Sequence, residues 1–399
     1  IGDRMLNNFL EVSVGMKCTE IAQATLAKFH KREYRLMFAD CWNFDFIENE
    51  AIITQAIKEY QLGEEWNSYK NTVGMRLSGK VIGTDENLYY YHGIKTNYFI
   101  WQKNELLVGV MQALNTNKYV SMWYDQFYMP WAKEMRRKAP LRYDGFLLLL
   151  EYKEYLNAFL CIDIHGSRKV EVLPFESFKE YVDLGEKHKI IIYEVLDNKE
   201  RTFSIVENMK KQLLKVGYNT TDTIYDKMKR FAYFIRNNLD MEKEEKYSLL
   251  GVEALSAPTH IEGVKKIRDI ARMRNLYAIT LEYYAERKTE VIPLANYFRI
   301  AASNWQNIVS LLVKASYLKE YKGLEERVAK LIIKCADYEL DIINYMVALE
   351  KKIEFNYCEK KDIGVFDKGK KIELDIKHFY NNRAFALTEL NKEDANIDG

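Results

Sequence analysis

The sequence lacks the cysteine and glycine patterns that mark several common classes of protein. Its five cysteines are odd in number and widely spaced, and no C-x-x-C pair occurs, which argues against a zinc ribbon or a thioredoxin-type redox site. The motifs G-x-x-x-x-G-K-[ST], G-x-G-x-x-G and H-E-x-x-H are also absent, which weakens nucleotide-hydrolase, dinucleotide-binding and zinc-protease interpretations. We therefore expect free thiols in a reducing compartment and no metal.

Long apolar runs and an excess of one charge are absent as well. The longest apolar run, residues 146–150, is far shorter than the roughly 18 residues that span a membrane. The N-terminus has no basic head followed by the apolar segment of a signal peptide. Lys and Arg number 59 against 58 Asp and Glu, a net charge of +1, so no global field favours nucleic acid. We expect a cytoplasmic chain with neither membrane nor nucleic-acid partners.

The pattern of apolar residues changes along the chain and predicts an α+β fold followed by a helical region. Helical spacing occurs at 19–30, 50–61 and 104–117, and strand-length apolar segments at 119–125, 145–152 and 158–164. A strand followed by a helix is expected over 170–184. From residue 200 the periods are long and helical: 201–216, 221–238, 263–287, 294–321 and 325–353. We predict an α/β domain over 1–195, a helical domain over 200–355 and a strand-containing tail over 356–399.

Cys18 is the first candidate functional residue, because it lies at or just before the start of the helix at 19–30. The helix dipole and the exposed N–H groups of a first helical turn favour a thiolate there and can receive a developing oxyanion. The simpler interpretation is a small buried hydrophobic residue, which is what most free cysteines are.

Asp163 and His165 are the second candidate, at the end of the segment AFLCIDIHG. In this strand the two residues are two apart, so both side chains point to one face, and an aspartate that orients a histidine is the logic of a catalytic triad. A polar strand end with one exposed histidine is the alternative. His92, in YYYHG, is a similar case in a predicted loop.

The segment WYDQFYMPW is the third candidate, because aromatic residues are dense around a proline-ended turn. Trp123, Tyr128 and Trp131 would line an acyl or aryl pocket, and Asp125 would bind an amine. An aromatic corner of the core explains the same pattern equally well.

These segments resemble the butirosin-biosynthesis BtrH-like family over most of the chain. The stretch from Cys18 to Phe46, CTEIAQATLAKFHKREYRLMFADCWNFDF, resembles the family's opening. YVSMWYDQFYMPW resembles its aspartate–aromatic–proline segment, and GFLLLLEY followed by AFLCIDIHG resembles its paired strands. The stretch ASNWQNIVSLLVKAS is similar to the C-terminal part of members from nonribosomal peptide clusters.

The resemblance implies a papain-like or transglutaminase-like N-terminal domain and an activity in natural-product biosynthesis. Cys18 would take an acyl group from the phosphopantetheine arm of an acyl or peptidyl carrier protein, hold it as a thioester and pass it to an amine or peptide-like molecule. The transglutaminase-like amide synthase of closthioamide assembly is of the same functional type. No cofactor of the chain's own is implied. Asp163 fits the third triad position, and Trp42 and His92 join the predicted substrate-binding residues. A homodimer is compatible with the sequence.

One departure from the family pattern concerns the imidazole. The family places its catalytic histidine just before the strand GFLLLLEY, where this chain has Tyr143 and Asp144. An aspartate there would raise the pKa of the Cys18 thiol by like-charge repulsion. Either His165 or His92 supplies the imidazole from another direction, or the chain binds a carrier protein or natural product without catalysis.

A cysteine peptidase is a further alternative, since the fold alone does not specify the reaction. An acidic carrier protein would need a basic rim, which the sequence offers beside the strands. Its members are Lys133, Arg136, Arg137, Lys138 and Arg142. A solvated basic helix turn explains the same run.

Overall fold

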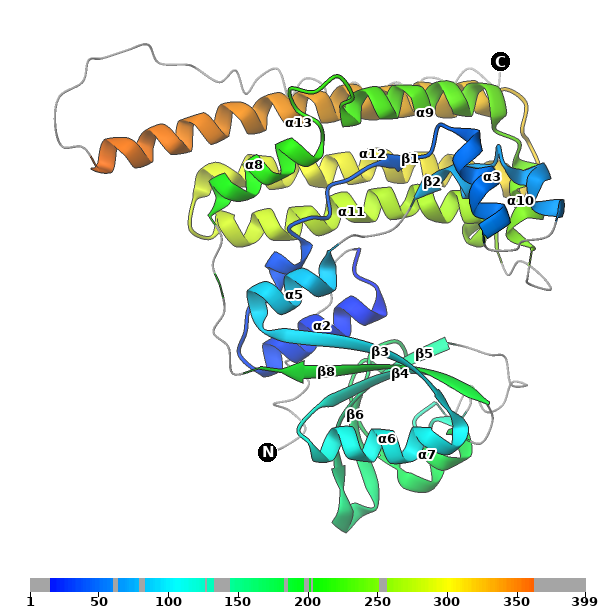
Figure 1. The fold of residues 1–399 in the computed structure, drawn as a ribbon, viewed down its shortest axis with the longest axis vertical. Coiled ribbons are helices and arrows are strands. Elements are labelled where there is room, and N and C mark those ends of the chain that lie inside the picture. The colour runs from blue at the N-terminus through cyan, green and yellow to red at the C-terminus, as the bar shows by residue number, and fades with distance from the viewer. Residues whose placement is uncertain are drawn as a thin grey trace, which may run out of the picture. The chain divides into compact units, whose positions relative to one another are not determined.

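A computed structural model describes residues 15–59, 64–78, 83–125, 128–132, 144–182, 186–196, 201, 204–250 and 257–361. It shows an α+β fold, with a six-stranded sheet followed by a series of long helices (Figure 1). Both regions belong to one unit of the chain, Ile1–Ile353, and a second unit comprises Glu354–Gly399. The predicted domains 1–195 and 200–355 thus lie almost entirely in the first unit, and the strand predicted in the tail lies outside the described residues.

Six antiparallel strands form the main sheet, in the order β3-β8-β4-β5-β6-β7. Their bounds are β3 Ile94–Gln102, β4 Tyr119–Asp125, β5 Asp144–Lys153, β6 Ala158–Asp163, β7 Val170–Pro174 and β8 Lys187–Val195. The strands predicted at 119–125, 145–152 and 158–164 are confirmed. Strand β8 was not predicted from the sequence, and it pairs with both β3 and β4, which it separates.

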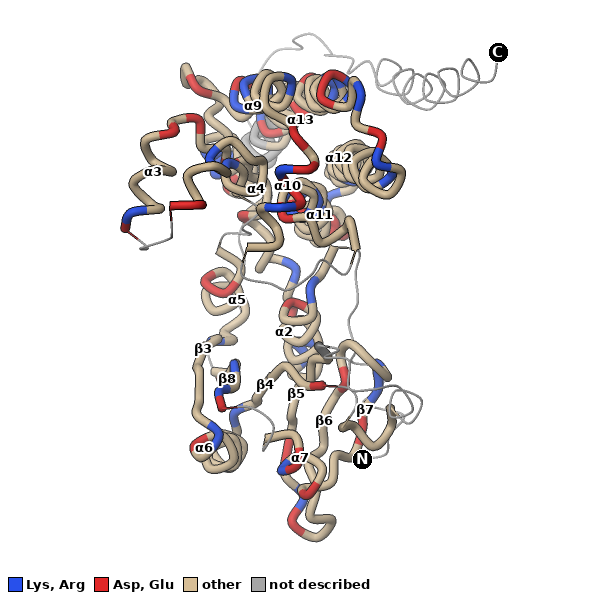
Figure 2. Tube along the Cα trace, turned by 90° about the vertical axis from the view of Figure 1, so that its right-hand side faces the viewer, with Lys and Arg blue, Asp and Glu red and all other residues tan. Residues whose placement is uncertain are grey.

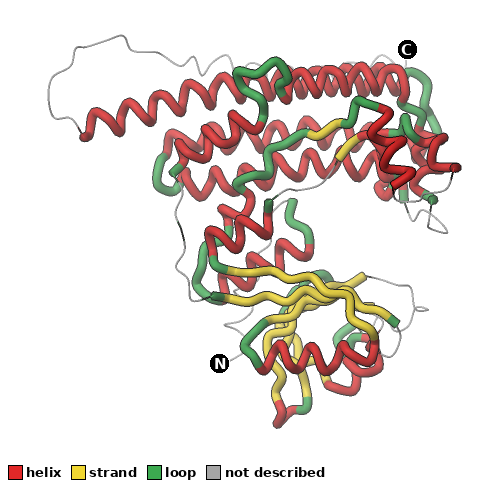
Figure 3. The backbone as a smooth tube through the Cα atoms, in the orientation of Figure 1, coloured by secondary structure: helices red, strands yellow, loops and turns green. Residues whose placement is uncertain are grey.

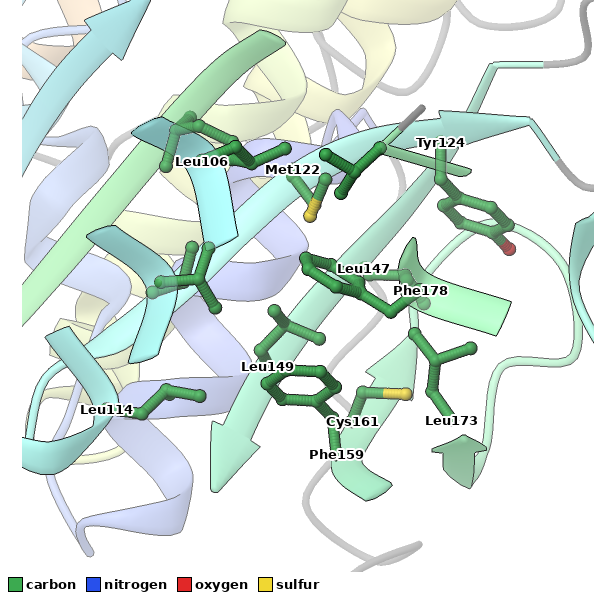
Figure 4. Close-up of a cluster of buried hydrophobic side chains, with 14 of the residues drawn as sticks. Leu106, Leu114, Met122, Tyr124, Leu147, Leu149, Phe159, Cys161, Leu173 and Phe178 are labelled. Atoms are coloured by element: carbon green, nitrogen blue, oxygen red, sulfur yellow. The ribbon is translucent and has the colours of Figure 1, made fainter. Parts of the chain in front are cut away.

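Helices cover both faces of this sheet, α6 (Lys103–Asn115) and α7 (Phe175–Val182) on one face and α2 (Cys18–Phe29) and α5 (Thr84–His92) on the other (Figure 3). The face toward α6 and α7 carries a buried apolar cluster that includes Met122, Leu147 and Phe178 (Figure 4). Side chains alternate along a strand, so the residues between these, such as Ser121, point toward α2. Each fully buried large apolar side chain stabilises the fold by about 1.5–3 kcal/mol.

Helix α2 forms where the sequence predicts a helix, with its first turn capped, and it is buried all round from Glu20 to Ala27. Ala22, Ala24 and Leu26 are fully buried. The Glu20 carboxylate accepts a hydrogen bond from the Lys17 N–H at 2.7 Å, which satisfies a donor at the helix start. The helix ends before Lys31, whose φ of 57° is left-handed.

The helical region follows the predicted periods except at α10 (Met241–Ser248), where the sequence predicts no helix. Its helices are α8 Ile205–Lys215, α9 Ile224–Asn238, α10 Met241–Ser248, α11 Glu262–Ala285, α12 Ile292–Leu318 and α13 Leu324–Lys361. Side chains of Ser204, Thr223 and Asp240 cap the first three of these helices. Lys, Arg, Asp and Glu are mixed along this region (Figure 2). None of the described helices combines the length and apolar character needed to cross a bilayer.

Between α2 and α5 the chain packs onto the helical region instead of the sheet (Figure 1). It contains α3 (Glu50–Glu59), α4 (Val73–Arg76) and a short ribbon of β1 (Asp45–Phe46) and β2 (Leu77–Ser78). Trp42, fully buried, donates its indole N–H to Glu339 of α13 at 2.9 Å. The same carboxylate binds Arg274 of α11 at 2.8 Å and Trp305 of α12 at 2.9 Å. This buried node ties residues 42–43 to three helices.

Candidate active site around Cys18

The structure brings Cys18 and His165 together from distant parts of the sequence. The Cys18 Sγ lies 3.5 Å from the His165 Nδ1, within hydrogen-bonding distance for sulfur. Cys18 is half-buried, whereas Cys41, Cys161 and Cys335 are buried. Of these cysteines, Cys18 thus combines partial exposure with an imidazole partner, which is the arrangement a nucleophilic thiol needs.

Cys18 occupies the first position of α2. Helical hydrogen bonding begins with the Ile21 N–H, which donates to Lys17 O at 2.9 Å. The N–H groups of Cys18 and Thr19 therefore have no acceptor within the helix, as is usual for the first amides of a helix. Such amides can donate to an oxyanion that develops on a carbonyl attacked by the thiol.

The start of α2 is anchored on α11 of the helical region. Arg272 donates to Glu20 at 2.7 Å and to Asp269 at 3.0 Å, and Lys17 pairs with Asp269 at 3.2 Å. Gly15, with φ of +94°, lies so close to α11 that an added Cβ would stand 3.3 Å from Arg272. These contacts fix the position of the sulfur relative to α11, and sequence reasoning did not predict them.

His165 lies in the turn that follows β6, and Asp163 holds this turn. The Asp163 carboxylate is fully buried and accepts hydrogen bonds from four N–H groups. The backbone N–H groups of His165, Gly166 and Ser167 donate at 3.2, 2.8 and 2.8 Å. The indole of Trp131 donates at 2.7 Å. Asp163 therefore positions His165 through its backbone, and in the described part of the chain its carboxylate contacts no imidazole.

The prediction that Asp163 and His165 point to one face of a strand is wrong, because β6 ends at Asp163. Asp163 is paired in register with Leu147, which belongs to the apolar cluster under α6 and α7. The carboxylate thus points to the face opposite α2. The turn after β6 redirects the chain so that His165 reaches Cys18.

Burial is the main influence on the pKa of the Cys18 thiol. Partial burial raises the pKa of the Cys18 thiol, and the Asp163 and Glu20 carboxylates raise it further. The Cys18 N–H and the Arg168 guanidinium, on the same turn as His165, act in the opposite direction without cancelling the effect of burial. The thiol is therefore protonated at neutral pH, and its activation requires a base.

Other predicted site residues are distributed between the surface and the core. Trp123 is partly exposed. Its ring packs edge-on against the Phe146 ring, with 4.8 Å between the ring centroids. Asp125 and Tyr128 are half-buried at the end of β4 and just beyond it. Trp131 is half-buried and holds Asp163, a contact that the predicted substrate-binding role did not anticipate.

Trp42 and His92 lie in the interior, so the structure gives no support to the substrate-binding role predicted for them. Trp42 is part of the Glu339 node, and His92, at the end of α5, is 1% exposed. Between the two candidate imidazoles, it is His165 that the structure brings to the thiol.

The remaining predictions fall on residues that the structure describes only in part. Asp144 begins β5 and its backbone pairs with Asp125. Tyr143 and the predicted basic rim, Lys133, Arg136, Arg137, Lys138 and Arg142, lie outside the described residues. Among the described residues, no group of three His, Cys, Asp or Glu side chains is arranged to hold a metal ion.

Comparison with known proteins assigns no family. No protein-family model matches the sequence, and no curated protein matches it significantly.

Proposed function

We propose that the protein is an acyltransferase that works through a thioester on Cys18. The observation that carries this proposal is the 3.5 Å contact between the Cys18 Sγ and the His165 Nδ1 at the start of a helix. A thiol whose pKa is raised by burial needs a general base, and an imidazole within hydrogen-bonding distance supplies one. The first amides of α2 support the developing oxyanion.

The reaction follows from this geometry. His165 takes the thiol proton as the Cys18 sulfur attacks the carbonyl carbon of a thioester donor. The donor's C–S bond breaks, and the departing thiolate receives the proton from His165. An amine then attacks the acyl-Cys18 carbonyl and gives a proton to His165, the C–S bond to Cys18 breaks, and His165 returns the proton to the sulfur. The products are an amide and the free donor thiol.

For the donor we propose the phosphopantetheine arm of an acyl or peptidyl carrier protein, and for the fold a papain-like arrangement. The resemblance of the segments around Cys18, Trp123 and Asp163 supports both. Asp125, which shares the face of Trp123 at the end of β4, is our candidate for binding the amine. The chain departs from the family pattern in taking its imidazole from the turn after β6.

A second candidate function is binding without catalysis. The elevated pKa of Cys18 and the absence of a carboxylate contact to the imidazole among the described residues favour it. An imidazole that no carboxylate orients is not held in the tautomer and orientation that it has in a complete triad.

Trapping of the acyl-enzyme separates the two functions. The protein is incubated with an acyl-pantetheine thioester, quenched in acid and analysed by intact mass and peptide mapping. Acyl transfer predicts one acyl group on Cys18, none in Cys18→Ala, and accumulation at least a hundredfold slower in His165→Ala. His260→Ala, a histidine remote in sequence from the pair, serves as the control. An unacylated Cys18 after prolonged incubation, with product binding intact, would establish the binding function instead.

A further inference from the structure

Helix α11 binds the chain on both sides of Cys18. Before it, Lys17 pairs with Asp269 at 3.2 Å. After it, both carboxylate oxygens of Glu20 accept hydrogen bonds from the Arg272 Nη1, at 2.7 and 2.9 Å. The Arg272 Nε donates to Asp269 at 3.0 Å, so one turn of α11 makes all of these contacts. We call Lys17, Glu20, Asp269 and Arg272 the α2–α11 clamp.

The two ion pairs that cross the clamp differ in burial. The side chains of Arg272 and Glu20 are 10% and 8% exposed, whereas that of Lys17 is 54% exposed. An exposed ion pair contributes little, because water competes for both charges. The loss of one member of a buried pair leaves the other charge without compensation, which is strongly unfavourable. The Arg272–Glu20 pair is therefore the part of the clamp that fixes the start of α2.

Glu20 connects this pair to the sulfur in two ways. Its carboxylate accepts the N–H of Lys17 at 2.7 Å and so holds the residue that precedes Cys18. Its negative charge also raises the pKa of the Cys18 thiol. Arg272 opposes this second effect, because a guanidinium bound to a carboxylate compensates the charge that the thiol would otherwise experience.

The other charged groups near the thiol belong to the turn after β6. His165 contacts the sulfur, the Arg168 guanidinium lowers the pKa of the thiol and the Asp163 carboxylate raises it. Asp163 is bound by the N–H groups of its own turn and by Trp131. Of these two carboxylates that raise the pKa of the thiol, Glu20 is thus the one whose charge the helical region compensates.

From this arrangement we propose that Arg272 is a positioning residue for Cys18. Through Glu20 it holds the first turn of α2 and compensates the carboxylate that this turn carries, so the helical region controls the reactivity of the thiol. The inference deepens the proposed function and rests on it for the acylation step. It gives the helical region a role in the site although the reacting pair, Cys18 and His165, lies outside that region.

The pH dependence of Cys18 alkylation by iodoacetamide, followed by peptide mapping, tests the clamp. Arg272→Gln leaves the Glu20 charge uncompensated and should raise the inflection by about 0.5–1 pH unit, whereas Glu20→Gln should lower it by a similar amount. The variant that carries both substitutions should return to the wild-type inflection. Loss of structure alone would move both single variants in the same direction, because each breaks the same contact.

A matched control and a second comparison keep the test decisive. Arg236→Gln removes an ion pair of 2.6 Å with Glu326 that includes no residue of α2 or α11, and it should leave the inflection unchanged. Urea unfolding monitors the folding of each variant. If Arg272→Gln does not fold, Glu20→Gln is compared with the wild type, since Arg272 keeps Asp269 and a glutamine can still accept the Lys17 N–H. An inflection at or above that of the wild type would then overturn the clamp.

Acylation of Cys18 by an acyl-pantetheine thioester separates this inference from the acyl-transfer proposal. We expect kcat/KM at pH 7 to fall about three- to tenfold in Arg272→Gln, because less thiolate is available, and to recover in the variant that carries both substitutions. Opposite shifts of the alkylation inflection with no acyl-Cys18 in any variant would support the clamp and refute the acyltransferase. Coincident inflections, or shifts of both single variants in one direction, would overturn the clamp and leave acylation of Cys18 standing.

Discussion

The replacement Asp163→Asn distinguishes a carboxylate that positions a turn from one that orients an imidazole. Both oxygens of Asp163 accept two N–H groups each: His165 and Gly166 on one, and Ser167 and Trp131 on the other. An asparagine retains one oxygen and turns an NH₂ group toward the other two donors. Two hydrogen bonds to a charged acceptor are lost, at about 1.5–3 kcal/mol each, so we expect the free energy of unfolding to fall by about 3–6 kcal/mol.

Trp131→Phe provides the matched control, because it removes one hydrogen bond to Asp163, keeps an aromatic ring and does not touch His165. We expect a loss of about 1.5–3 kcal/mol in urea unfolding, and slower acylation of Cys18 in both variants because the turn that carries His165 is loosened. If Asp163→Asn unfolds at the wild-type urea concentration, the carboxylate does not hold the turn through its backbone.

Three further predictions concern titration and the buried node. Because burial raises the pKa of Cys18 from its ordinary value of 9.0, its alkylation by iodoacetamide should accelerate with pH and show an inflection above that of a cysteine in an unfolded peptide; an inflection below that of the peptide would refute the raised pKa. Burial also raises the pKa of Glu244 from 4.5 to about 7. The folded state thus retains a proton that the unfolded chain releases, and stability should fall by about 3 kcal/mol as pH rises from 4.5 to 7. Unfolding measured against pH should show this slope in the wild type and not in Glu244→Gln. Glu339→Ala leaves the Arg274 guanidinium buried without its carboxylate and should cost about 3–5 kcal/mol, seen as a lower urea midpoint, whereas an unchanged midpoint would contradict the node.

Local patterns in the sequence were sufficient for many elements of the fold, but not for β8 or α10. Helix α2 and strands β4, β5 and β6 lie within a few residues of their predicted bounds, because each has a strong period of its own. Strand β8 escaped prediction, although residues 190–192 form an isoleucine run that is typical of a buried strand. Its place between β3 and β4 is a long-range pairing, and nothing local in the sequence specifies it.

The sequence predicted which residues form the candidate site, but not the contacts that hold those residues in place. Helix and strand ends in the sequence indicate Cys18, Asp163 and His165, and the Cys18–His165 contact agrees with one of the two imidazoles that the sequence leaves open. Asp163 does not orient the His165 ring, as the triad prediction required. Side chains alternate between the two faces only within a strand, and β6 ends at Asp163. The pairing of Arg272 with Glu20 joins residues that are 252 positions apart, beyond the reach of any local pattern.

Two anchors set the distance between the sulfur and the imidazole. Helix α2 carries Cys18 and is held from the helical region through Arg272, whereas the turn after β6 carries His165 and is held from the far face of the sheet through Asp163. Helix α2 also contacts the sheet, where the His30 Nε2 lies 2.7 Å from the Tyr119 hydroxyl, so contacts with both the helical region and the sheet set the Cys18–His165 distance. In the proposed acyl transfer, activation of a thiol whose pKa burial keeps high would depend on the distance between the sulfur and the imidazole, so the packing of α2 against α11 would affect the rate without supplying any reacting atom.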